Sequence, residues 1–218
     1  MLRGDAGGMP SGNAARPPSR EDVERLLSVT GFSHLQLRET PPAVRRLRPG
    51  VQLDFSGVAK GYAVDEVWDL LSEADLSDYL VEIGGEVRTR GTRADGRAWS
   101  IGIESPDRTG VTEAVPLRDA AIATSGDYRN YFEHEGERYS HVLDPRVGWP
   151  VSHGLASVTV IASSAATADA LATALLVLGP DTGLQLAVDQ GMAVRLVVST
   201  AEGLKVLLTP AYEAGFQR

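Results

Sequence analysis

The stretch IATSGDYRNYFEHEGERYSHVLDPRVGWPV, residues Ile122–Val151, carries more chemically useful side chains than any other run of the chain. An apolar strand-like run leads into it, and turn-forming residues at Glu135–Gly136 and Asp144–Gly148 divide it. This pattern predicts a hairpin whose rim carries hydroxyl, imidazole and guanidinium groups, the last of which favour phosphate-like partners. These groups belong to Thr124, Ser125, His141, Arg129 and Arg146. A polar hairpin tip without any chemistry has the same composition, because turns collect polar residues.

The composition narrows the possible settings. The chain has 218 residues, of which 43% are hydrophobic, so it can build one large or two small cores. Its net charge is -8 and its basic residues are scattered, which argues against a nucleic-acid partner. It has no cysteine, which excludes disulfides, thiolate nucleophiles, cysteine metal sites and lipid attachment through cysteine.

Membrane and export signals are missing from the sequence as written. No apolar run is long enough for a transmembrane segment, and the start lacks the charged-then-apolar pattern of a signal peptide. These patterns alone predict a cytoplasmic protein.

The N-terminal part divides at about residue 18. Residues 1–18 are rich in Gly, Ala, Pro and Arg without an apolar period, which predicts a disordered segment before one domain over residues 19–218. Ser19, with Asp22 three residues later, begins a short helix that extends through Leu27.

A strand followed by a helix is predicted around Asp54. Val51–Phe55 has a strand pattern, and Ser56 is a suitable N-cap for a helix with one apolar face. Lys60 lies in the first turn on that face, where its ammonium and the unpaired N–H groups of the helix would make an anion site suited to phosphate. The alternative is a surface lysine whose stem covers the edge of the core.

Two glycines interrupt the next strands. Tyr79–Ile83 is predicted to be a buried strand, and Gly84 and Gly85 separate it from a second strand through Val87. Paired glycines in a strand pattern indicate either the close approach of a ligand or backbone, or a simple bulge.

A long apolar helix is predicted near the C-terminal end, beginning at Ser163 or Ser164 and ending at Gly179. Asp169 and Thr173 are four residues apart on a face that also looks buried. Because an unpaired buried carboxylate is very costly, these oxygens need partners. A hard cation would satisfy both, and a structural hydrogen bond from Thr173 to the helix backbone is the alternative.

Five blocks of the sequence occur in the order and spacing of the ApbE family, and the chain resembles this family from Ser19 to Leu208. The blocks are LDFSGVAKGYAVD (53–65), VEIGGEVRTRG (81–91), WSIGIESP (99–106), ATSGDYRNYF with SHVLDPRVGWPV (123–151) and SVTVIASSAATADALATALLVLG (157–179). The family consists of magnesium-dependent FAD:protein FMN transferases. The resemblance implies an α+β fold of the tunnelling-fold type, with mixed sheets and helices and FAD held between two lobes.

The resemblance also implies roles for individual residues. It assigns FAD binding to Asp54, Lys60, His141 and the backbone around Leu143. It assigns Mg²⁺ to the Gly57 carbonyl, Asp169 and Thr173. His141, as a proton-transfer or diphosphate-positioning group, and Asp169 are its candidate catalytic residues.

Two departures from the family pattern stand out. Position 57 is more often alanine in the family, a change that a backbone ligand tolerates. Family members also carry an upstream part with a signal segment and flavin contacts, and most are exported to the cell envelope, so the resemblance implies a chain that is truncated relative to the family.

The activity implied by the resemblance is transfer of FMN from FAD to a threonine hydroxyl of an acceptor flavoprotein, with release of AMP. Suitable acceptors are redox-pump or electron-transport subunits. Two alternatives stay open at this stage. Water could replace the threonine, which gives hydrolysis of FAD to FMN and AMP, or the protein could bind flavin without turnover.

Overall fold

The computed structural model describes residues 18–107, 109–126, 131–134 and 137–215. The chain forms two compact units, one from residues 1–51 and 130–150 and the other from residues 52–129 and 151–218. Helices and mostly antiparallel strands are mixed without βαβ alternation, so the predicted α+β class is confirmed. The segment predicted to be disordered lies outside the described residues except for Pro18.

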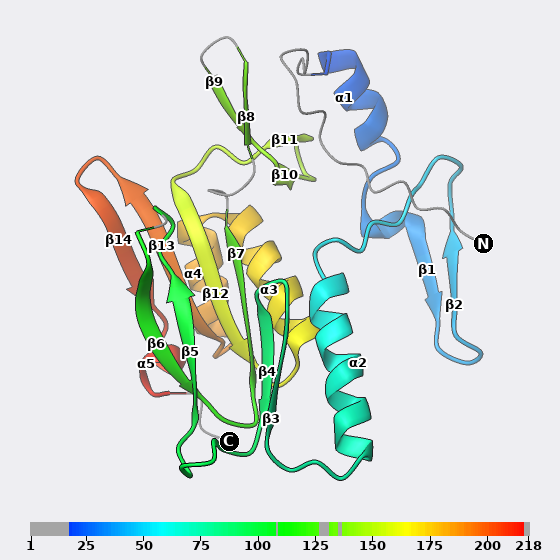
Figure 1. Cartoon of the computed structure of the whole chain (residues 1–218). Coiled ribbons are helices and arrows are strands. Elements are labelled where there is room, and N and C mark those ends of the chain that lie inside the picture. The colour runs from blue at the N-terminus through cyan, green and yellow to red at the C-terminus, as the bar shows by residue number, and fades with distance from the viewer. Residues whose placement is uncertain (1–17, 108, 127–130, 135–136, 216–218) are drawn as a thin grey trace. The chain divides into compact units, whose positions relative to one another are not determined.

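The first unit contains short elements (Figure 1). Helix α1 (Arg20–Leu27) begins as predicted, since the Ser19 side chain accepts a hydrogen bond of 3.1 Å from the Asp22 backbone N–H. A 3-10 turn, η1 (Phe32–His34), leads into an antiparallel pair of strands. The paired strands of this unit are β1 (Leu35–Arg38) with β2 (Ala43–Arg46), β8 (Tyr131–His134) with β9 (Glu137–Ser140), and β10 (Leu143–Asp144) with β11 (Trp149–Pro150).

The second unit is organised around a six-stranded sheet in the order β14-β13-β12-β7-β4-β3, in which all neighbours are antiparallel. The strands are β3 (Tyr79–Ile83), β4 (Glu86–Arg90), β7 (Ala121–Gly126), β12 (Leu155–Ala162), β13 (Ala193–Thr200) and β14 (Gly203–Leu208). The central strands β7 and β12 are rich in apolar and β-branched residues, which favour buried strands.

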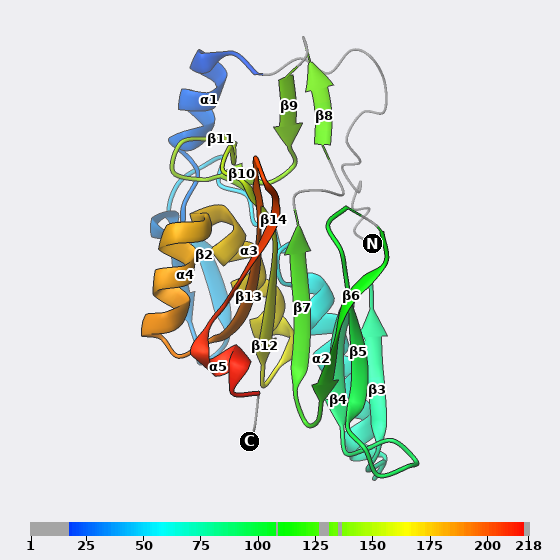
Figure 2. The same cartoon turned by 90° about the vertical axis from the view of Figure 1, so that its left-hand side faces the viewer.

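The two faces of this sheet are covered by different elements. Helices α2 (Ala59–Glu73), α3 (Ala165–Leu178) and α4 (Pro180–Asp189) pack on one face. The hairpin of β5 (Trp99–Glu104) and β6 (Val111–Leu117), together with α5 (Pro210–Glu213), packs on the other. In Figure 2, β5 and β6 lie in front of β3 and β4, and α2 lies behind these strands.

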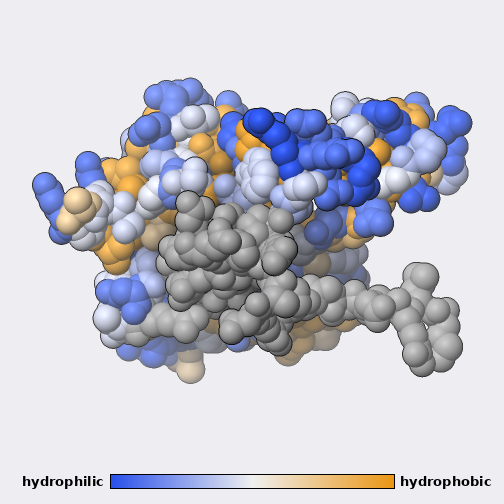
Figure 3. Space-filling model, turned by 90° about the horizontal axis from the view of Figure 1, so that it is seen from above, coloured by the Kyte–Doolittle hydropathy of each residue, from blue (hydrophilic) through white to orange (hydrophobic). Residues whose placement is uncertain are grey.

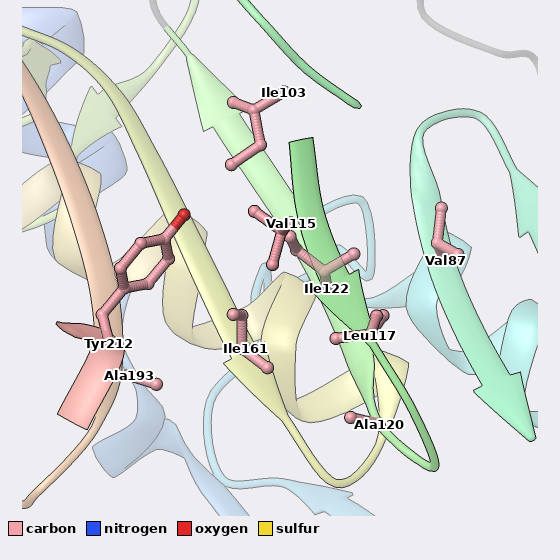
Figure 4. Close-up of a cluster of buried hydrophobic side chains, with 9 residues drawn as sticks. All are labelled: Val87, Ile103, Val115, Leu117, Ala120, Ile122, Ile161, Ala193 and Tyr212. Carbon is pink, nitrogen blue, oxygen red and sulfur yellow. The ribbon is translucent and has the colours of Figure 1, made fainter. Parts of the chain in front are cut away.

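An apolar cluster fills the space between the hairpin and the sheet. Ile122 and Ile161 from the sheet meet Leu117 and Val115 from the hairpin and Tyr212 from α5 (Figure 4). Apolar burial of this kind fixes the hairpin on the face opposite to the helices.

The helices α2 and α3 are held together at Gly61. A Cβ at this position would overlap the carbonyl oxygen of Ala165, so glycine allows the two backbones to touch. The Asp65 carboxylate of α2 accepts hydrogen bonds of 2.9 Å from the backbone N–H groups of Ala165 and Ala166 and so caps α3. These contacts fix the first turns of α2 relative to α3.

Helix α3 begins and ends as predicted. The Ser164 side chain accepts a hydrogen bond from the Thr167 backbone N–H, and Gly179 is the C-cap. Residues 180–189 form α4, which follows α3 directly after Gly179.

Two local predictions were wrong. Val51–Phe55 is not a strand, and Ser56 does not cap α2, which begins at Ala59 after a turn. The reason is the Asp54 carboxylate, which accepts a hydrogen bond of 2.8 Å from the Ser56 N–H and bends the chain there. Gly84 and Gly85 separate β3 from β4 as predicted. They form the turn of this hairpin with positive φ, which excludes the bulge that was one of the two alternatives.

The hairpin predicted over residues 122–151 was wrong as a single unit, although strands do pair on either side of both predicted turns, β8 with β9 and β10 with β11. Its first part, β7, belongs to the six-stranded sheet of the second unit, whereas the remainder forms the short strand pairs of the first unit. The expected turn at Glu135–Gly136 and the Arg129 side chain lie outside the described residues. Strand β7 was predicted to be apolar, and its apolar run is what places it at the centre of a sheet.

Hydrophobic side chains also reach the surface. Figure 3 shows hydrophobic residues in small patches among hydrophilic ones on the face that it presents. Among the described residues, no helix combines the length and the apolar character that crossing a bilayer requires.

Candidate functional site

Asp169 and Thr173 lie on the face of α3 that packs against the sheet and α2. The Asp169 side chain is only 3% exposed, and its Oδ2 accepts a hydrogen bond of 3.0 Å from the Gly61 N–H. Thr173 Oγ1 lies 3.0 Å from Ser125 Oγ of β7. The partner of Thr173 is therefore a side chain of the sheet, whereas the sequence had suggested the helix backbone as an alternative.

Gly57 lies beside Thr173. A Cβ at Gly57 would be 3.4 Å from Thr173 Cγ2 and 3.7 Å from Thr173 Oγ1. The structure thus brings together the Gly57 backbone and Thr173, with Asp169 one helical turn away on the same face of α3. All three are the residues predicted to hold a metal.

The donors gathered here are chemically uniform. They are a carboxylate, the hydroxyls of Thr173 and Ser125, and the backbone of Gly57, without a nitrogen or sulfur ligand among them. Oxygen donors of this kind suit Mg²⁺, which keeps several waters and needs few protein carboxylates. Within the described ranges, no three His, Asp or Glu side chains form a metal-binding group, so this site differs from an all-protein carboxylate cage.

Lys60 lies in the first turn of α2 and forms an ion pair with Glu86 of β4. The Lys60 side chain is 47% exposed, whereas that of Glu86 is only 2% exposed. The Glu86 Oε1 atom takes the ion pair, and its Oε2 atom has no hydrogen-bond partner among the described residues. Lys60 is thus half-buried: its ammonium contacts the buried Glu86 carboxylate, and the side chain remains partly exposed to solvent.

The Glu86 carboxyl has a raised pKa. Burial is the main cause, Lys60 acts in the opposite direction, and the negative charge of Asp169 raises the pKa further. Since the charge of Asp169 is felt at Glu86, the Lys60–Glu86 pair and the Asp169 oxygens belong to one electrostatic neighbourhood.

The N-terminus of α2 is suited to an anion. Its N-cap is Val58, which makes no side-chain hydrogen bond to the helix. The Ala59 N–H donates a hydrogen bond of 2.8 Å to the Phe55 carbonyl oxygen and the Gly61 N–H donates to Asp169, so the helix end attracts a further anion mainly through its dipole. Gly84 leaves space for the lysine stem beside this end, since a Cβ there would be 3.2 Å from Lys60 Cδ. The paired glycines therefore do permit a close approach, by a side chain.

Asp54 lies in the segment that precedes α2 and is exposed. Its carboxylate accepts hydrogen bonds from the side chain and the backbone N–H of Ser56, and these bonds hold the pKa of Asp54 below its ordinary value. Asp54 is therefore charged at neutral pH.

His141 and Leu143 belong to the first unit. His141 is half-buried, and Leu143 is exposed. Both line a largely apolar cavity of about 500 Å³, which the α1 residues Val23 and Leu27 and the side chain of Trp149 also line. Nearby, the Arg146 guanidinium donates hydrogen bonds to Asp144, with 2.7 Å between Nη2 and Oδ2, so this arginine already has an anionic partner.

Glu86 was not among the predicted site residues, and the sequence did not distinguish the role of Thr124 from that of Ser125. Successive side chains of a strand point to opposite faces, so Ser125 reaches Thr173, whereas Thr124 Oγ1 lies 2.8 Å from Thr159 Oγ1 of β12. One signal for Glu86 was present in the sequence. A carboxylate directly follows two glycines at the start of a strand, and all the residues of that strand are buried or half-buried.

Known proteins resemble this chain in sequence and in fold. Residues 5–196 match the model of the ApbE family. A FAD:protein FMN transferase of Vibrio cholerae is 41% identical over 207 residues, and one of Haemophilus influenzae is 36% identical over 209 residues. The apo crystal structure of the Pseudomonas stutzeri flavinyl transferase ApbE superposes with a TM-score of 0.84 at 44% identity.

These matches cover nearly all of this chain but a smaller share of each relative. The Vibrio cholerae match covers 93% of this chain and 61% of the relative, and the Haemophilus influenzae match covers 94% and 60%. The Pseudomonas stutzeri structure matches 96% of this chain and 65% of its own. The chain therefore spans about three fifths of the length of these curated relatives. Because the family model matches most of the chain and these structures share its fold, the chain belongs to the ApbE family.

Proposed function

We propose that this protein transfers FMN from FAD to a threonine hydroxyl of an acceptor flavoprotein, in a reaction that depends on Mg²⁺ and releases AMP. The observation that carries the proposal is the set of oxygen donors of Gly57, Asp169 and Thr173 in one neighbourhood with Lys60 in the first turn of α2. The relatives named FAD:protein FMN transferase support the same reaction class.

The residues of α3 would hold the metal. Asp169 supplies the carboxylate, Thr173 the hydroxyl and Gly57 the backbone carbonyl. When bound, Mg²⁺ would neutralise negative charge on the diphosphate of FAD. Asp169 is kept in place by the Gly61 N–H and Thr173 by the Ser125 hydroxyl, so neither donor needs to reorganise.

Lys60 and the N-terminus of α2 would bind and orient the diphosphate. Phosphoryl transfer depends mainly on positioning and electrostatic stabilisation, which a fixed ammonium beside a helix end can supply. Asp54, just before this helix, and the backbone around Leu143 would make further contacts to FAD.

The transfer itself balances without another reactant. The threonine oxygen forms a bond to the FMN-side phosphorus, and the bond from that phosphorus to the bridging oxygen breaks, so that AMP leaves with this oxygen. The hydroxyl proton must go to a base, and His141 is the candidate for it because an imidazole nitrogen can accept a proton.

The test is incubation of the protein with FAD, Mg²⁺ and an acceptor protein, followed by mass spectrometry of the acceptor and chromatography of the nucleotides. We expect an acceptor that is heavier by one FMN group and an equal amount of AMP. An acceptor whose target threonine is replaced by valine, and a reaction with EDTA, are the controls. Free FMN with AMP and an unmodified acceptor would indicate FAD hydrolysis, and bound flavin without AMP would indicate a flavin-binding protein.

A further inference from the structure

Glu86 is a buried carboxylate whose place in the fold has no structural explanation in its own surroundings. It opens β4 directly after the Gly84–Gly85 turn, is 2% exposed, and has one oxygen without a hydrogen-bond partner among the described residues. Among the described residues, its ion-pair partner is Lys60. A carboxylate buried with half of its hydrogen bonds unmade lowers the stability of a fold, and an apolar residue would serve packing better.

The geometry of the pair explains why the carboxylate is there. Lys60 has a long stem and three donors, and its side chain is 47% exposed. Without a partner, such a side chain samples many rotamers. The Glu86 carboxylate contacts the ammonium from the buried side. The absence of a side chain at Gly84 leaves space for the stem of Lys60. The remaining donors of the ammonium are left for a ligand that arrives from solvent.

We propose that Glu86 is a positioning residue, whose carboxylate fixes the Lys60 ammonium beside the N-terminus of α2 so that it meets the diphosphate of the substrate in one orientation. This inference rests on the proposed function for the identity of the substrate. The position of the ammonium itself can be measured without it.

Binding and turnover should respond differently when the carboxylate is removed. Glu86→Gln keeps the shape and deletes a negative charge that opposes the anionic ligand. We therefore expect ADP, used as a diphosphate probe, to bind no more weakly than to the unaltered protein. An ammonium that is free to move orients the reacting phosphorus poorly, so kcat for FAD should fall roughly tenfold to a hundredfold. By contrast, Lys60→Met should weaken the binding of ADP.

A double-mutant cycle tests whether Glu86 acts through Lys60. In the Lys60→Met background, Glu86→Gln should leave kcat unchanged, because there is no ammonium left to position. The matched control is Glu82→Gln on β3 of the same hairpin, whose exposed carboxylate accepts a hydrogen bond of 2.9 Å from the Gly85 N–H, which the amide oxygen can still accept. We expect this control to match the unaltered protein in both assays.

A second measurement does not depend on activity. NMR of the lysine ammonium groups should show Lys60 as a resonance with slow hydrogen exchange in the unaltered protein, and Glu86→Gln should remove it. An unchanged resonance would overturn the inference, as would equal losses of kcat in the presence and absence of Lys60. A Glu86→Gln chain that unfolds at the assay temperature would also overturn it, since the carboxylate would then serve stability. If the NMR result holds but no AMP or modified acceptor appears, the proposed function fails while the positioning role stands.

Discussion

The two faces of the six-stranded sheet each carry a polar cluster with a buried charge, and the clusters are built in opposite ways. On the helix face, the buried member of the ion pair is Glu86, and its partner Lys60 reaches solvent. On the hairpin face, Arg195 of β13 is buried, and its Nε lies 2.9 Å from Glu113 Oε2 of β6, which is 37% exposed. Tyr212 of α5 donates a hydrogen bond of 3.0 Å to Glu113 as well.

The difference separates a cluster that holds elements of the fold together from one that we propose binds a ligand. Glu113 joins three elements, because it is contacted from β13 and α5 and lies on the hairpin, so its interactions hold the layers of the unit together. Burial, with a further contribution from the charge of Glu113, raises the pKa of Tyr212, which therefore stays protonated and a donor. The helix-face ion pair joins only α2 and β4, and its ammonium reaches solvent in the neighbourhood of the Asp169 and Thr173 oxygens.

The largest effect is expected from Asp169→Asn. The amide oxygen can still accept the hydrogen bond from the Gly61 N–H, so the fold should persist, but the charge that would hold Mg²⁺ is lost. We expect FAD turnover at ordinary Mg²⁺ concentrations to fall by about 10²-fold or more, since metal stabilisation of phosphoryl transfer is worth several kcal/mol. Kinetics over a range of Mg²⁺, with a melting curve as the control for folding, provide the measurement. Full turnover in this variant would remove Asp169 from the metal site.

Glu113→Ala should have the opposite profile. It leaves the Arg195 guanidinium buried without its anion, and the loss of one partner of a buried pair is strongly destabilising. Because Glu113 is partly solvated, we expect a loss of about 2–3 kcal/mol, which lowers the Tm by roughly 5–10 °C for a chain of this size.

In the same Glu113→Ala protein, FAD turnover below the melting transition should stay within twofold of the unaltered protein. Calorimetry and the AMP-release assay on one preparation give both values. A loss of turnover without a loss of stability would mean that the hairpin face takes part in the reaction and would break the contrast between the two faces.

The contrast between the two faces of the sheet can also be tested at two neighbouring residues of β7, Ser125 and Thr124. Ser125→Ala removes the hydrogen-bond partner of Thr173. Residues that support a metal ligand typically contribute tenfold to a hundredfold in metal affinity or activity. For the loss of this one hydroxyl, we expect about tenfold weaker Mg²⁺ affinity. Thr124→Val removes a hydrogen bond to Thr159 on the other face, so it should lower the Tm slightly and leave the Mg²⁺ dependence unchanged. Titration of turnover with Mg²⁺ compares the two, and equal shifts in both variants would contradict the assignment of faces.

The sequence predicted the helix that carries Asp169 and Thr173 better than it predicted the strand residues that contact the site. The apolar period placed Asp169 and Thr173 on a buried face of one helix, and glycine with proline marked where this helix ends, because these signals are local. Glu86 and Ser125 were not recognised as partners of Lys60 and Thr173, because their positions depend on which strands pair and on which face each residue takes. The Val51–Phe55 segment was wrong for a related reason, since a carboxylate bonding to its own backbone overrode a strand pattern.

The smallest expected effect is on stability, and it tests whether Glu86 is retained for function. Because the pKa of Glu86 is raised in the folded protein, mainly by burial, folding favours its protonated form. Its favourable contribution is therefore present below the pKa of an unfolded glutamate, about 4.3, and is lost as the pH rises through the higher pKa of the folded state.

Glu86→Gln resembles the protonated form at every pH. We expect the variant and the unaltered protein to melt together near pH 4, and the variant to melt a few degrees higher at pH 7, as followed by melting curves across this range. Glu82→Gln, which changes an exposed carboxylate of the same hairpin, should show no such divergence. A variant that is less stable at pH 7 would mean that the ion pair with Lys60 outweighs the burial of the charge, and that the helix-face cluster stabilises the fold as the hairpin-face cluster does.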